Sequence, residues 1–420
     1  MWGDRLCRFL PAWSARASPV ARGAKPPARS RPGARRWEEL ERMSLEIRPV
    51  STRRERRLFL TFPWRVFRGD RMWVPPIIGE MEKRLDPQRG AWFTHGIAEC
   101  FIAWRGKEPV GTICCAEDKA LNARLKRRDA VFGFNHYLPD YAVAAALWDH
   151  AAAWARAHGL DTLFGPFNLD YEDGYGILIE GYDRPPTLLC GHTPPYYREF
   201  VERYGFKPAR EQNVALEVPA SEFSSPDGAM AKLHRVAELV RTRGRVTVRS
   251  GNMADWDNEI NRVLEVLNES LKVLPDFLPW ERASLEALAK EMRPFIDPDL
   301  ILFGEVDGRC VGFLLGLPNL NEALIHANGL RYPWDTLRAW WALRKRPKCL
   351  CLKSIAVLPE YWARGVDALM LYEMGRRAVA KGYTWGDLSI TGAENPMTVR
   401  MASRLGARIY KRWQVYIKAV

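Results

Sequence analysis

The feature that most constrains the fold of this chain is an internal duplication. An apolar strand, a glycine turn and a second apolar strand, the pattern of a β-hairpin, start at Phe101 and recur from Leu302. Later in each half, a short amphipathic helix ends at a glycine, as helix C-termini commonly do. The stretches Gly111–Gly205 and Gly312–Gly406 have equal lengths. We therefore predict two tandem copies of one α/β unit, each built on a mixed α+β sheet.

Strands and a linker-like stretch suggest where the two copies meet. Each predicted copy ends in a strand, at 213–218 in the first and at 413–418 in the second. A Pro-, Ser- and Gly-rich stretch follows the first of these strands, which is typical of a linker. We therefore expect a first domain at 43–220, a linker at 221–244 and a second domain at 245–420.

The first tenth of the chain carries almost half of its positive charge. Of the net charge of +13, residues 1–42 contribute +6, from ten Lys or Arg side chains against four acidic ones. Ala, Arg, Pro, Ser and Gly dominate this segment, and such a composition cannot bury enough apolar surface to offset the entropy of ordering. We expect 1–42 to be a disordered basic extension. Two interpretations stay open: a targeting peptide, or a protein whose true start is Met43.

Composition and motif spacing exclude several classes of protein. No stretch approaches the roughly 18 apolar residues of a membrane-spanning helix, so no transmembrane anchor is expected. The eight cysteines form no CxxC pair, and the seven histidines show no HExxH or CxxH spacing. These absences argue for a reducing compartment and against a metal site. No nucleic-acid reader motif accompanies the positive charge, so we expect a cytoplasmic protein that binds neither metal nor nucleic acid.

The segment 350–370 carries the most informative motif. An apolar strand runs to Pro359, a short loop contains Arg364 and Gly365, and a helix is predicted from Val366 onward. A strand that leads directly into a helix N-terminus points several backbone N–H groups, and the positive end of the helix dipole, at one spot. The segment therefore predicts an anion cradle, for which a pyrophosphate is the natural ligand.

This segment resembles the acyl-CoA loop of the GNAT superfamily of CoA-dependent N-acyltransferases, in which Val-x-Pro-x-Tyr precedes Arg/Gln-x-x-Gly-x-Gly/Ala. Downstream, Asn395 opens a predicted helix that ends before Gly406, which is similar to the next motif of that superfamily. The predicted order of strands and helices over 245–420 is similar to a whole GNAT domain. The resemblance thus implies two tandem GNAT-like domains. The first is expected to be degenerate, because no Arg/Gly loop joins its strand 131–134 to the helix that follows.

Carried over to this chain, the resemblance implies acyl-CoA as co-substrate in the second domain, and no metal. The pyrophosphate is expected at the backbone N–H groups of the loop and the helix N-terminus. The implied cofactor-binding residues are Ile355, Val357, Arg364, Gly365, Val366, Ala368 and Asn395. Trp362 and Asp367 depart from the superfamily pattern, and an Asp367 carboxylate would repel a pyrophosphate unless it points away.

Amine acylation needs a base that removes a proton from the attacking nitrogen, and help for the departing thiolate. In many members of the superfamily a Tyr supplies that help, but the matching position here is Ala402. The candidate bases are Glu322 after the second hairpin, Asp387 on the strand before Asn395, and His326. A purely structural role is the alternative for each of them.

A Gly-, Pro- and Tyr-rich run at 165–197 is a candidate lining for an acceptor or acyl cleft. Its candidate substrate-binding residues are Asn168, Tyr175 and Tyr197. The alternative is that the run is a rigid structural turn region, and the sequence does not decide between the two.

The segment 330–348 predicts an amphipathic helix with Trp334 and Trp341 on one half of its wheel and Arg338 and Lys345 on the other. Aromatic and basic side chains on one helix suit the surface of an anionic membrane. In that interpretation the segment makes peripheral contact with a membrane, and the two tryptophans contact a lipid substrate. The alternative is a helix packed on its own domain.

From about residue 43 to its end, the chain is similar to a family of tandem GNAT-like bacterial proteins that includes ceramide synthases. The runs Gly165–Asn168, Pro194–Tyr197 and Gly365–Leu369 carry this resemblance. It implies the transfer of a long acyl chain from acyl-CoA to the amine of a sphingoid base or similar lipid, at the inner face of the membrane. Two alternatives stay open: an N-acetyltransferase of a small amine, and a catalytically inactive GNAT pair that binds acyl-CoA.

Overall fold

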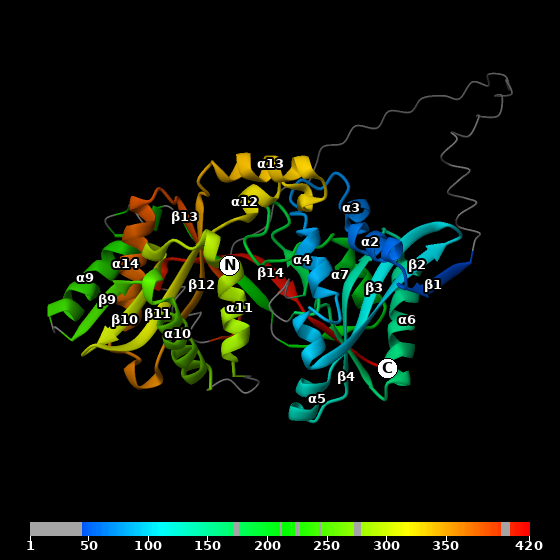
Figure 1. The fold of residues 1–420 in the computed structure, drawn as a ribbon, viewed down its shortest axis with the longest axis horizontal. Helices are drawn as coiled ribbons and strands as arrows, with labels where there is room; N and C mark the ends of the chain where they lie inside the picture. Colours follow the sequence, from blue (N-terminus) through cyan, green and yellow to red (C-terminus); the bar gives the residue numbers. More distant parts are fainter. Residues whose placement is uncertain are drawn as a thin grey trace, which may run out of the picture. The chain divides into compact units, whose positions relative to one another are not determined.

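The computed structural model describes residues 44–170, 176–210, 212–219, 221–222, 225, 227–242, 245–272, 279–395 and 404–420. The basic extension 1–42, Tyr175, Ala402 and most of the helix predicted after Asn395 lie outside these residues. Contacts divide the chain after Ser44, and Leu45–Val420 forms a single unit of two sheets with their helices (Figure 1).

The first sheet has the strand order β1-β2-β3-β4-β5-β15-β7, and all of its neighbours are antiparallel except β4 and β5. Its strands are β1 (Leu45–Pro49), β2 (Gly96–Arg105), β3 (Glu108–Asp118), β4 (Asp129–Tyr137), β5 (Thr162–Gly165), β7 (Lys207–Pro208) and β15 (Tyr416–Ala419). The hairpin predicted from Phe101 is thus confirmed as β2 and β3.

The second sheet has the order β6-β14-β8-β13-β12-β11-β10-β9, and only β12 and β13 run parallel. Its strands are β6 (Ile177–Glu180), β8 (Asn213–Val218), β9 (Val246–Ser250), β10 (Ile301–Val306), β11 (Arg309–Pro318), β12 (Cys349–Val357), β13 (Trp385–Gly392) and β14 (Arg408–Gln414). The predicted α/β class with mixed sheets is confirmed.

The two halves of the chain exchange strands. The C-terminal strand β15 lies between β5 and β7 of the first sheet, while β8 of the first half lies between β13 and β14 of the second. This differs from the expectation that each copy keeps its own final strand. The single strand expected at 413–418 is broken at the fully buried Val415, where the chain passes from one sheet into the other.

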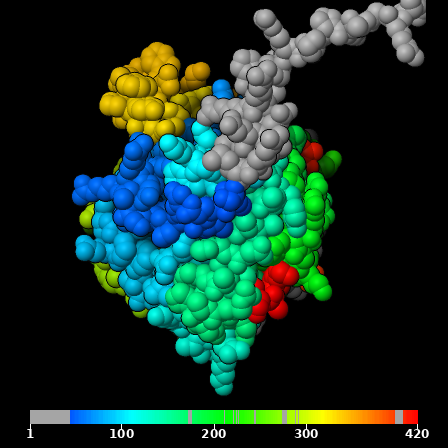
Figure 2. All heavy atoms as spheres, turned by 90° about the vertical axis from the view of Figure 1, so that its right-hand side faces the viewer, coloured from blue at the N-terminus to red at the C-terminus, as the bar shows by residue number. Residues whose placement is uncertain are grey.

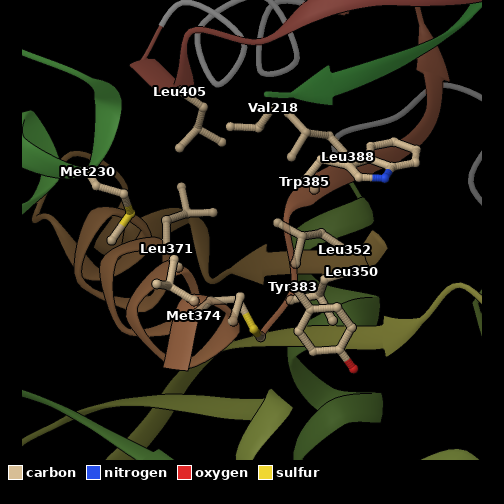
Figure 3. Close-up of a pocket in the computed structure, with 14 residues that line it drawn as sticks. Val218, Met230, Leu350, Leu352, Leu371, Met374, Tyr383, Trp385, Leu388 and Leu405 are labelled. Carbon is tan, nitrogen blue, oxygen red and sulfur yellow. The ribbon is translucent and has the colours of Figure 1, made fainter. Parts of the chain in front are cut away.

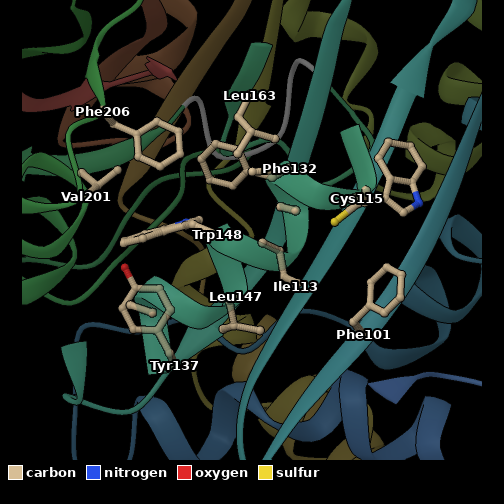
Figure 4. Close-up of a cluster of buried hydrophobic side chains, with 14 of the residues drawn as sticks. Phe101, Ile113, Cys115, Phe132, Tyr137, Leu147, Trp148, Leu163, Val201 and Phe206 are labelled. Carbon is tan, nitrogen blue, oxygen red and sulfur yellow. The ribbon is translucent and has the colours of Figure 1, made fainter. Parts of the chain in front are cut away.

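Helices of the first half cover the faces of the first sheet. They are α2 (Arg53–Thr61), α3 (Pro63–Val66), α4 (Ile78–Arg84), α5 (Lys119–Leu125), α6 (Tyr141–Ala157) and α7 (Tyr196–Arg203). The Asp140 side chain caps α6 by accepting a hydrogen bond from the Ala142 N–H. One face of α6 packs Leu147 and Trp148 against Phe132 and other strand residues, and this core is the largest of the first half (Figure 4).

Helices of the second half are α9 (Ala229–Thr242), α10 (Trp256–Leu271), α11 (Arg282–Met292), α12 (Asn321–Leu324), α13 (Pro333–Leu343) and α14 (Val366–Ala380). Helix α9 occupies most of the stretch expected to be a linker. The Pro- and Ser-rich residues before it obscure its periodicity, yet Ala237 and Val240 pack on Leu369 of α14. Among the described residues, no helix combines the length and the apolar character needed to cross a bilayer.

Candidate active site

The loop predicted to form an anion cradle lies between β12 and α14. β12 ends at Val357, and α14 begins at Val366 with Gly365 as its N-cap in a left-handed backbone conformation (φ +84°). A Cβ on Gly365 would lie 2.5 Å from Cγ2 of Val240, so neither the backbone nor the space favours a side chain here. The first N–H groups of a helix lack partners within it, and its dipole favours an anion beside them.

The other predicted loop residues lie around the same helix start. Val366 and Ala368 are buried in the first turn of α14, and Arg364 is exposed directly before it. The doubtful Asp367 pairs with Arg404, with 2.7 Å between Oδ2 and Nη1. The Asp367 charge is therefore compensated within the chain.

Strands β12 and β13 separate on the way to this loop. Their parallel pairing has three steps, the last between Cys351 and Asp387. Beyond that step β12 remains paired with β11 as far as Val357, and β13 remains paired with β8. Ile355 and Val357 thus lie in a part of β12 whose second edge has no paired strand in the described chain. This unpaired edge extends from the level of Asp387 toward the end of β12, after which the loop leads to α14.

Asp387 lies at the point where the strands separate, and it is fully buried. Its Oδ2 accepts hydrogen bonds from the Thr187 hydroxyl (2.9 Å) and from the Tyr410 hydroxyl. Its Oδ1 accepts the backbone N–H of Ser389 (2.6 Å). Burial, together with the neighbouring Asp387 charge, raises the pKa of Tyr410 well above its usual value. The carboxylate is therefore shielded, and Tyr410, which is only partly buried, connects it to the surroundings.

Two polar residues near this carboxylate escaped the sequence analysis. Ser389 has φ +60° within β13, where the pairing register with β8 shifts, and its buried hydroxyl has no hydrogen-bond partner among the described residues. A non-glycine residue in this conformation marks strain, which clusters at functional sites. Lys353 on β12 donates to the Leu188 carbonyl. Burial opposes its charge, but nearby thiols and Asp387 outweigh that effect and raise the pKa of Lys353.

The second candidate base, Glu322, makes hydrogen bonds to the backbone. On α12, its Oε2 accepts the N–H of Lys348 (2.9 Å) and its Oε1 accepts the N–H of Cys349 (3.0 Å). These bonds fix the start of β12. Glu322, His326 and Trp341 together line a groove of about 800 Å³ between α12 and α13. The structure thus brings these three predicted residues together, and Asp387 is not among the residues that line their groove.

A segment of the first half covers the Asp387 cluster. Asn321 Nδ2 donates to the carbonyls of Pro186 (3.1 Å) and Thr187 (2.8 Å). Asn319 Oδ1 accepts the N–H of Leu188 (3.1 Å). These bonds hold the Pro-rich part of the run 165–197 against the second sheet, where it supplies Thr187 to the cluster.

Asn395 follows β13 directly. Its N–H donates to the Gly392 carbonyl (3.2 Å), and its Nδ2 to the Thr391 hydroxyl (3.4 Å). These bonds place Asn395 in a turn directly after β13.

Comparisons with known proteins agree with this geometry, although no protein-family model matches the chain. A bacterial ceramide synthase from Caulobacter vibrioides is 29% identical over 90% of this chain and 98% of its own length. Protein YghO from Escherichia coli is 26% identical over 89% and 95%. Among solved structures, a tandem GNAT protein from the clavulanic acid biosynthesis pathway superposes with a TM-score of 0.53 at 12% identity, over 90% and 98% of the two chains. A glucosamine N-acetyltransferase region of a fungal β-N-acetylglucosaminidase reaches 0.51 at 12% identity, over 90% of this chain and 38% of that one.

The chain has the fold of tandem GNAT proteins, and its similarity to a ceramide synthase over nearly its full length supports an N-acyltransferase. The predicted resemblance to bacterial ceramide synthases is confirmed by the first of these relatives, and the predicted enzyme class is confirmed with it. Among the described residues of this N-acyltransferase, no group of His, Cys, Asp and Glu is arranged to hold a metal ion.

In the first half of the N-acyltransferase, the chain itself fills the corresponding gap between parallel strands. Pairing of β4 with β5 ends at Val131, and the N–H of Phe167 then donates to the Phe132 carbonyl (2.8 Å). The N–H of Phe134 donates to Oδ1 of Asn168 (2.8 Å). A Cβ on Gly133 would lie 1.6 Å from the Phe167 carbonyl oxygen, so only glycine fits beneath this plug.

Phe167 and Asn168, which we call the plug, offer a structural reason to expect that the first domain is degenerate. Because Phe167 and Asn168 occupy the edge of β4 beyond Val131, a ligand cannot pair with the strand there. The amide of Asn168, a predicted substrate-binding residue, is engaged by the backbone, and its role in an acceptor cleft stays a prediction.

Tyr197 belongs to the core of the first half. It is 3% exposed, and its ring stacks on Tyr137 with 4.2 Å between centroids. Its hydroxyl accepts the N–H of Tyr137 (3.1 Å), and burial raises its pKa. The structure therefore places Tyr197 apart from the Asp387 cluster.

An apolar crevice of about 30 Å³ lies between α14 and the second sheet (Figure 3). Leu350 and Leu352 of β12, Leu388 of β13 and Met374 of α14 line it. Because side chains alternate along a strand, Asp387 points to the other face of the sheet. The crevice and the carboxylate are thus on different sides of β13.

Proposed function

We propose that this N-acyltransferase transfers a long acyl chain from acyl-CoA to the amine of a sphingoid base or a similar lipid. The observation that supports the proposal is the separation of β12 from β13 beyond Asp387. This opening leaves one edge of β12 without a paired strand in the described chain, between the Asp387 cluster and the loop before α14. The similarity to a bacterial ceramide synthase over nearly the full length of that protein supports the choice of substrates.

The donor would lie along the opening. Its pyrophosphate fits the backbone N–H groups at Gly365 and Val366, with the exposed Arg364 as the nearest counter-charge on the loop. The amide groups of its pantetheine arm can pair with the free edge of β12 beyond Cys351, as another strand would. This arrangement delivers the thioester to the point where the strands meet, beside Asp387.

Asp387 is the base that this geometry favours. The amine nitrogen forms a bond with the thioester carbonyl carbon, the carbon–sulfur bond breaks, and the nitrogen loses a proton. Because Asp387 is shielded, the proton would reach it through the Tyr410 hydroxyl, which donates to Oδ2. The released thiolate takes up a proton as free CoA.

The acceptor proposal rests on the apolar surroundings. Leu317, Leu320, Cys349 and Cys351 form a buried apolar cluster with Leu188, on the β12 face that Asp387 shares. The surroundings of Asp387 are therefore apolar on this face, which favours a lipid amine over a small polar amine. The proposal includes peripheral contact with a membrane through 330–348, as the source of the acceptor.

The test is mass spectrometry of the purified chain incubated with palmitoyl-CoA or acetyl-CoA, each with sphinganine, 3-ketosphinganine or spermidine. We expect an N-acyl amide from palmitoyl-CoA with a long-chain base. An amide from acetyl-CoA and spermidine alone would instead identify a small-amine acetyltransferase. CoA binding without an amide in any mixture would identify an inactive pair.

Asp387→Asn and Glu322→Gln separate the two candidate bases. Asp387→Asn should lower kcat by about 100-fold or more, the usual effect of losing a general base; it should also lower the thermal midpoint of unfolding, because the buried carboxylate accepts three hydrogen bonds. Glu322→Gln should mainly lower that midpoint, because its carboxylate holds the start of β12. The opposite pattern would assign the base to Glu322.

A further inference from the structure

Helix α13 turns its apolar face to solvent. Of the fourteen large apolar side chains that are exposed among the described residues, six come from the twelve residues 332–343. Their exposed fractions are 41% for Tyr332, 54% for Trp334, 68% for Leu337, 55% for Trp340, 65% for Trp341 and 39% for Leu343. An exposed apolar patch of this kind marks a surface that binds something.

The orientation of α13 is the reverse of that expected for a surface helix. Its buried positions are Asp335 (0% exposed) and Ala339 (8%), one turn apart on a narrow face. The opposite face carries Leu337, Trp340 and Trp341. A helix that packs on its own domain buries its large apolar side chains. The alternative prediction, that the apolar face of 330–348 packs on its own domain, is therefore wrong.

This exposure is built into the fold. Asn328, Gly329 and Leu330, directly before α13, all have positive φ (47°, 67° and 54°). Oδ2 of the buried Asp335 accepts hydrogen bonds from Asn328 Nδ2 and from the Tyr332 N–H, both 3.1 Å. Asn328 Oδ1 in turn accepts the indole N–H of a tryptophan of α3, Trp64, at 2.7 Å. The turn thus fixes the start of α13 and the direction of its apolar face.

Positive charge surrounds the apolar face. The basic side chains on and after α13 that are exposed are Arg338, Arg344, Lys345, Arg346 and Lys348. The one acidic residue of 330–348 is the buried Asp335. The Arg344 guanidinium lies over the Trp340 ring, 3.8 Å from its centroid, which explains how a cation is accommodated on the aromatic side of the helix.

We infer that α13 docks on the surface of an anionic lipid bilayer. The tryptophans and Leu337 enter the boundary between headgroups and acyl chains, and the flanking Arg and Lys side chains contact lipid phosphates. A second copy of this chain is a poor occupant, because the same five cations would face one another across a symmetric interface. The bilayer, in contrast, satisfies the apolar face and the charge together.

Docking in this orientation would place the groove between α12 and α13 at the membrane. Trp340, Trp341 and Lys345 line the groove from α13 and its end, and Glu322 lines it from α12. Lys348, the exposed residue before β12, also lines the groove. In Figure 1, α12 and α13 lie next to each other at the top of the view. In Figure 2, the gold-coloured α12–α13 region protrudes from the surface at the upper left. This step rests on the proposed function, since a lipid acceptor would use the groove to approach the reaction centre.

The test is co-flotation of the full chain with vesicles of phosphatidylcholine containing 30 mol% phosphatidylglycerol, against vesicles of phosphatidylcholine alone. We expect the wild type to float with the anionic vesicles and to be released by high salt. The paired substitution Trp340→Ser and Trp341→Ser should weaken binding at least tenfold, and so should Lys345→Glu with Arg346→Glu. The matched control is Leu239→Ser, an equally exposed apolar residue on α9 (62%), which should bind as the wild type does.

Equal flotation of the Trp340/Trp341 variant and the wild type would overturn the inference. A dimeric wild type that becomes monomeric in this variant, measured by light scattering, would overturn it too, because the face would then be covered by a second copy. Vesicle binding needs no turnover, so it is decided separately from the proposed reaction. If the docking and the proposed reaction are both correct, the Trp340/Trp341 variant should lose turnover with a base held in vesicles.

Discussion

A buried lysine in the second sheet makes stability depend on pH in a way that can be calculated. Lys411 on β14 is 0% exposed, and its Nζ donates to the carbonyls of Gly181 and Arg184 (2.7 Å for the latter). Burial lowers its pKa from 10.5 to about 8. Between these two values the unfolded chain binds a proton that the folded chain has released, so the free energy of unfolding rises with pH there. For this one group, the rise from pH 7 to pH 10 is about 2–3 kcal/mol.

Lys411→Met removes this dependence. Its two carbonyl partners lose a donor at every pH, which adds a constant to the stability difference between the two proteins; the titration of Lys411 in the wild type adds the part that changes with pH. We therefore expect the wild type to gain about 2–3 kcal/mol over Lys411→Met between pH 7 and pH 10, measured by urea unfolding at each pH. Lys232→Met, on the exposed surface of α9, controls for the loss of one positive charge. Parallel stability curves for the wild type and Lys411→Met would refute the reasoning.

Two further substitutions test the two strand openings. Gly365→Ala places a Cβ at a left-handed backbone position, 2.5 Å from Val240. The KM for acyl-CoA should therefore rise about tenfold or more, as expected for a loss of over about 1.4 kcal/mol of binding free energy. An unchanged KM would show that the loop is not part of the donor site. Asn168→Ala leaves the N–H of Phe134 without its partner beneath the plug. It should lower the free energy of unfolding by about 1–3 kcal/mol with kcat retained, whereas a loss of kcat in a stable variant would support the predicted cleft role.

The sequence predicted those parts of the fold that follow from local pattern. The helix predicted from Val366 onward is confirmed as α14, because the glycine before it and its apolar periodicity are local signals. The strand at 213–218 was also recovered, but its pairing with β13 and β14 was not. Pattern along a strand fixes which face is buried, and it contains no information on which neighbour supplies the hydrogen bonds.

The candidate site divides in the same way. The loop around Gly365 could be predicted, because a strand, a glycine and a helix start are consecutive in sequence. Thr187 and Tyr410, which donate to Asp387, are separated from it by 200 and 23 residues and belong to no motif. Only a weak signal in the sequence pointed to polar groups near Asp387: Lys353 and Ser389 lie in strands that are mostly apolar.

Strand exchange gives the last prediction, which concerns the boundary near residue 220. A fragment that ends there would keep β8 without its sheet neighbours β13 and β14. It would also lose β15, and with it the strand that pairs both with β5 and with β7. Unpaired strand edges of this kind favour aggregation.

We therefore expect 45–219 and 220–420, expressed separately, to be insoluble or to lack cooperative unfolding. Co-expression should restore a soluble complex, because β8 and β15 can then pair across the break, as they do in the intact chain. Circular dichroism during thermal unfolding would distinguish these cases. Two soluble fragments with sharp transitions of their own would show that each half folds without its partner's strand, and the exchange would then serve to orient the halves and not to complete their sheets.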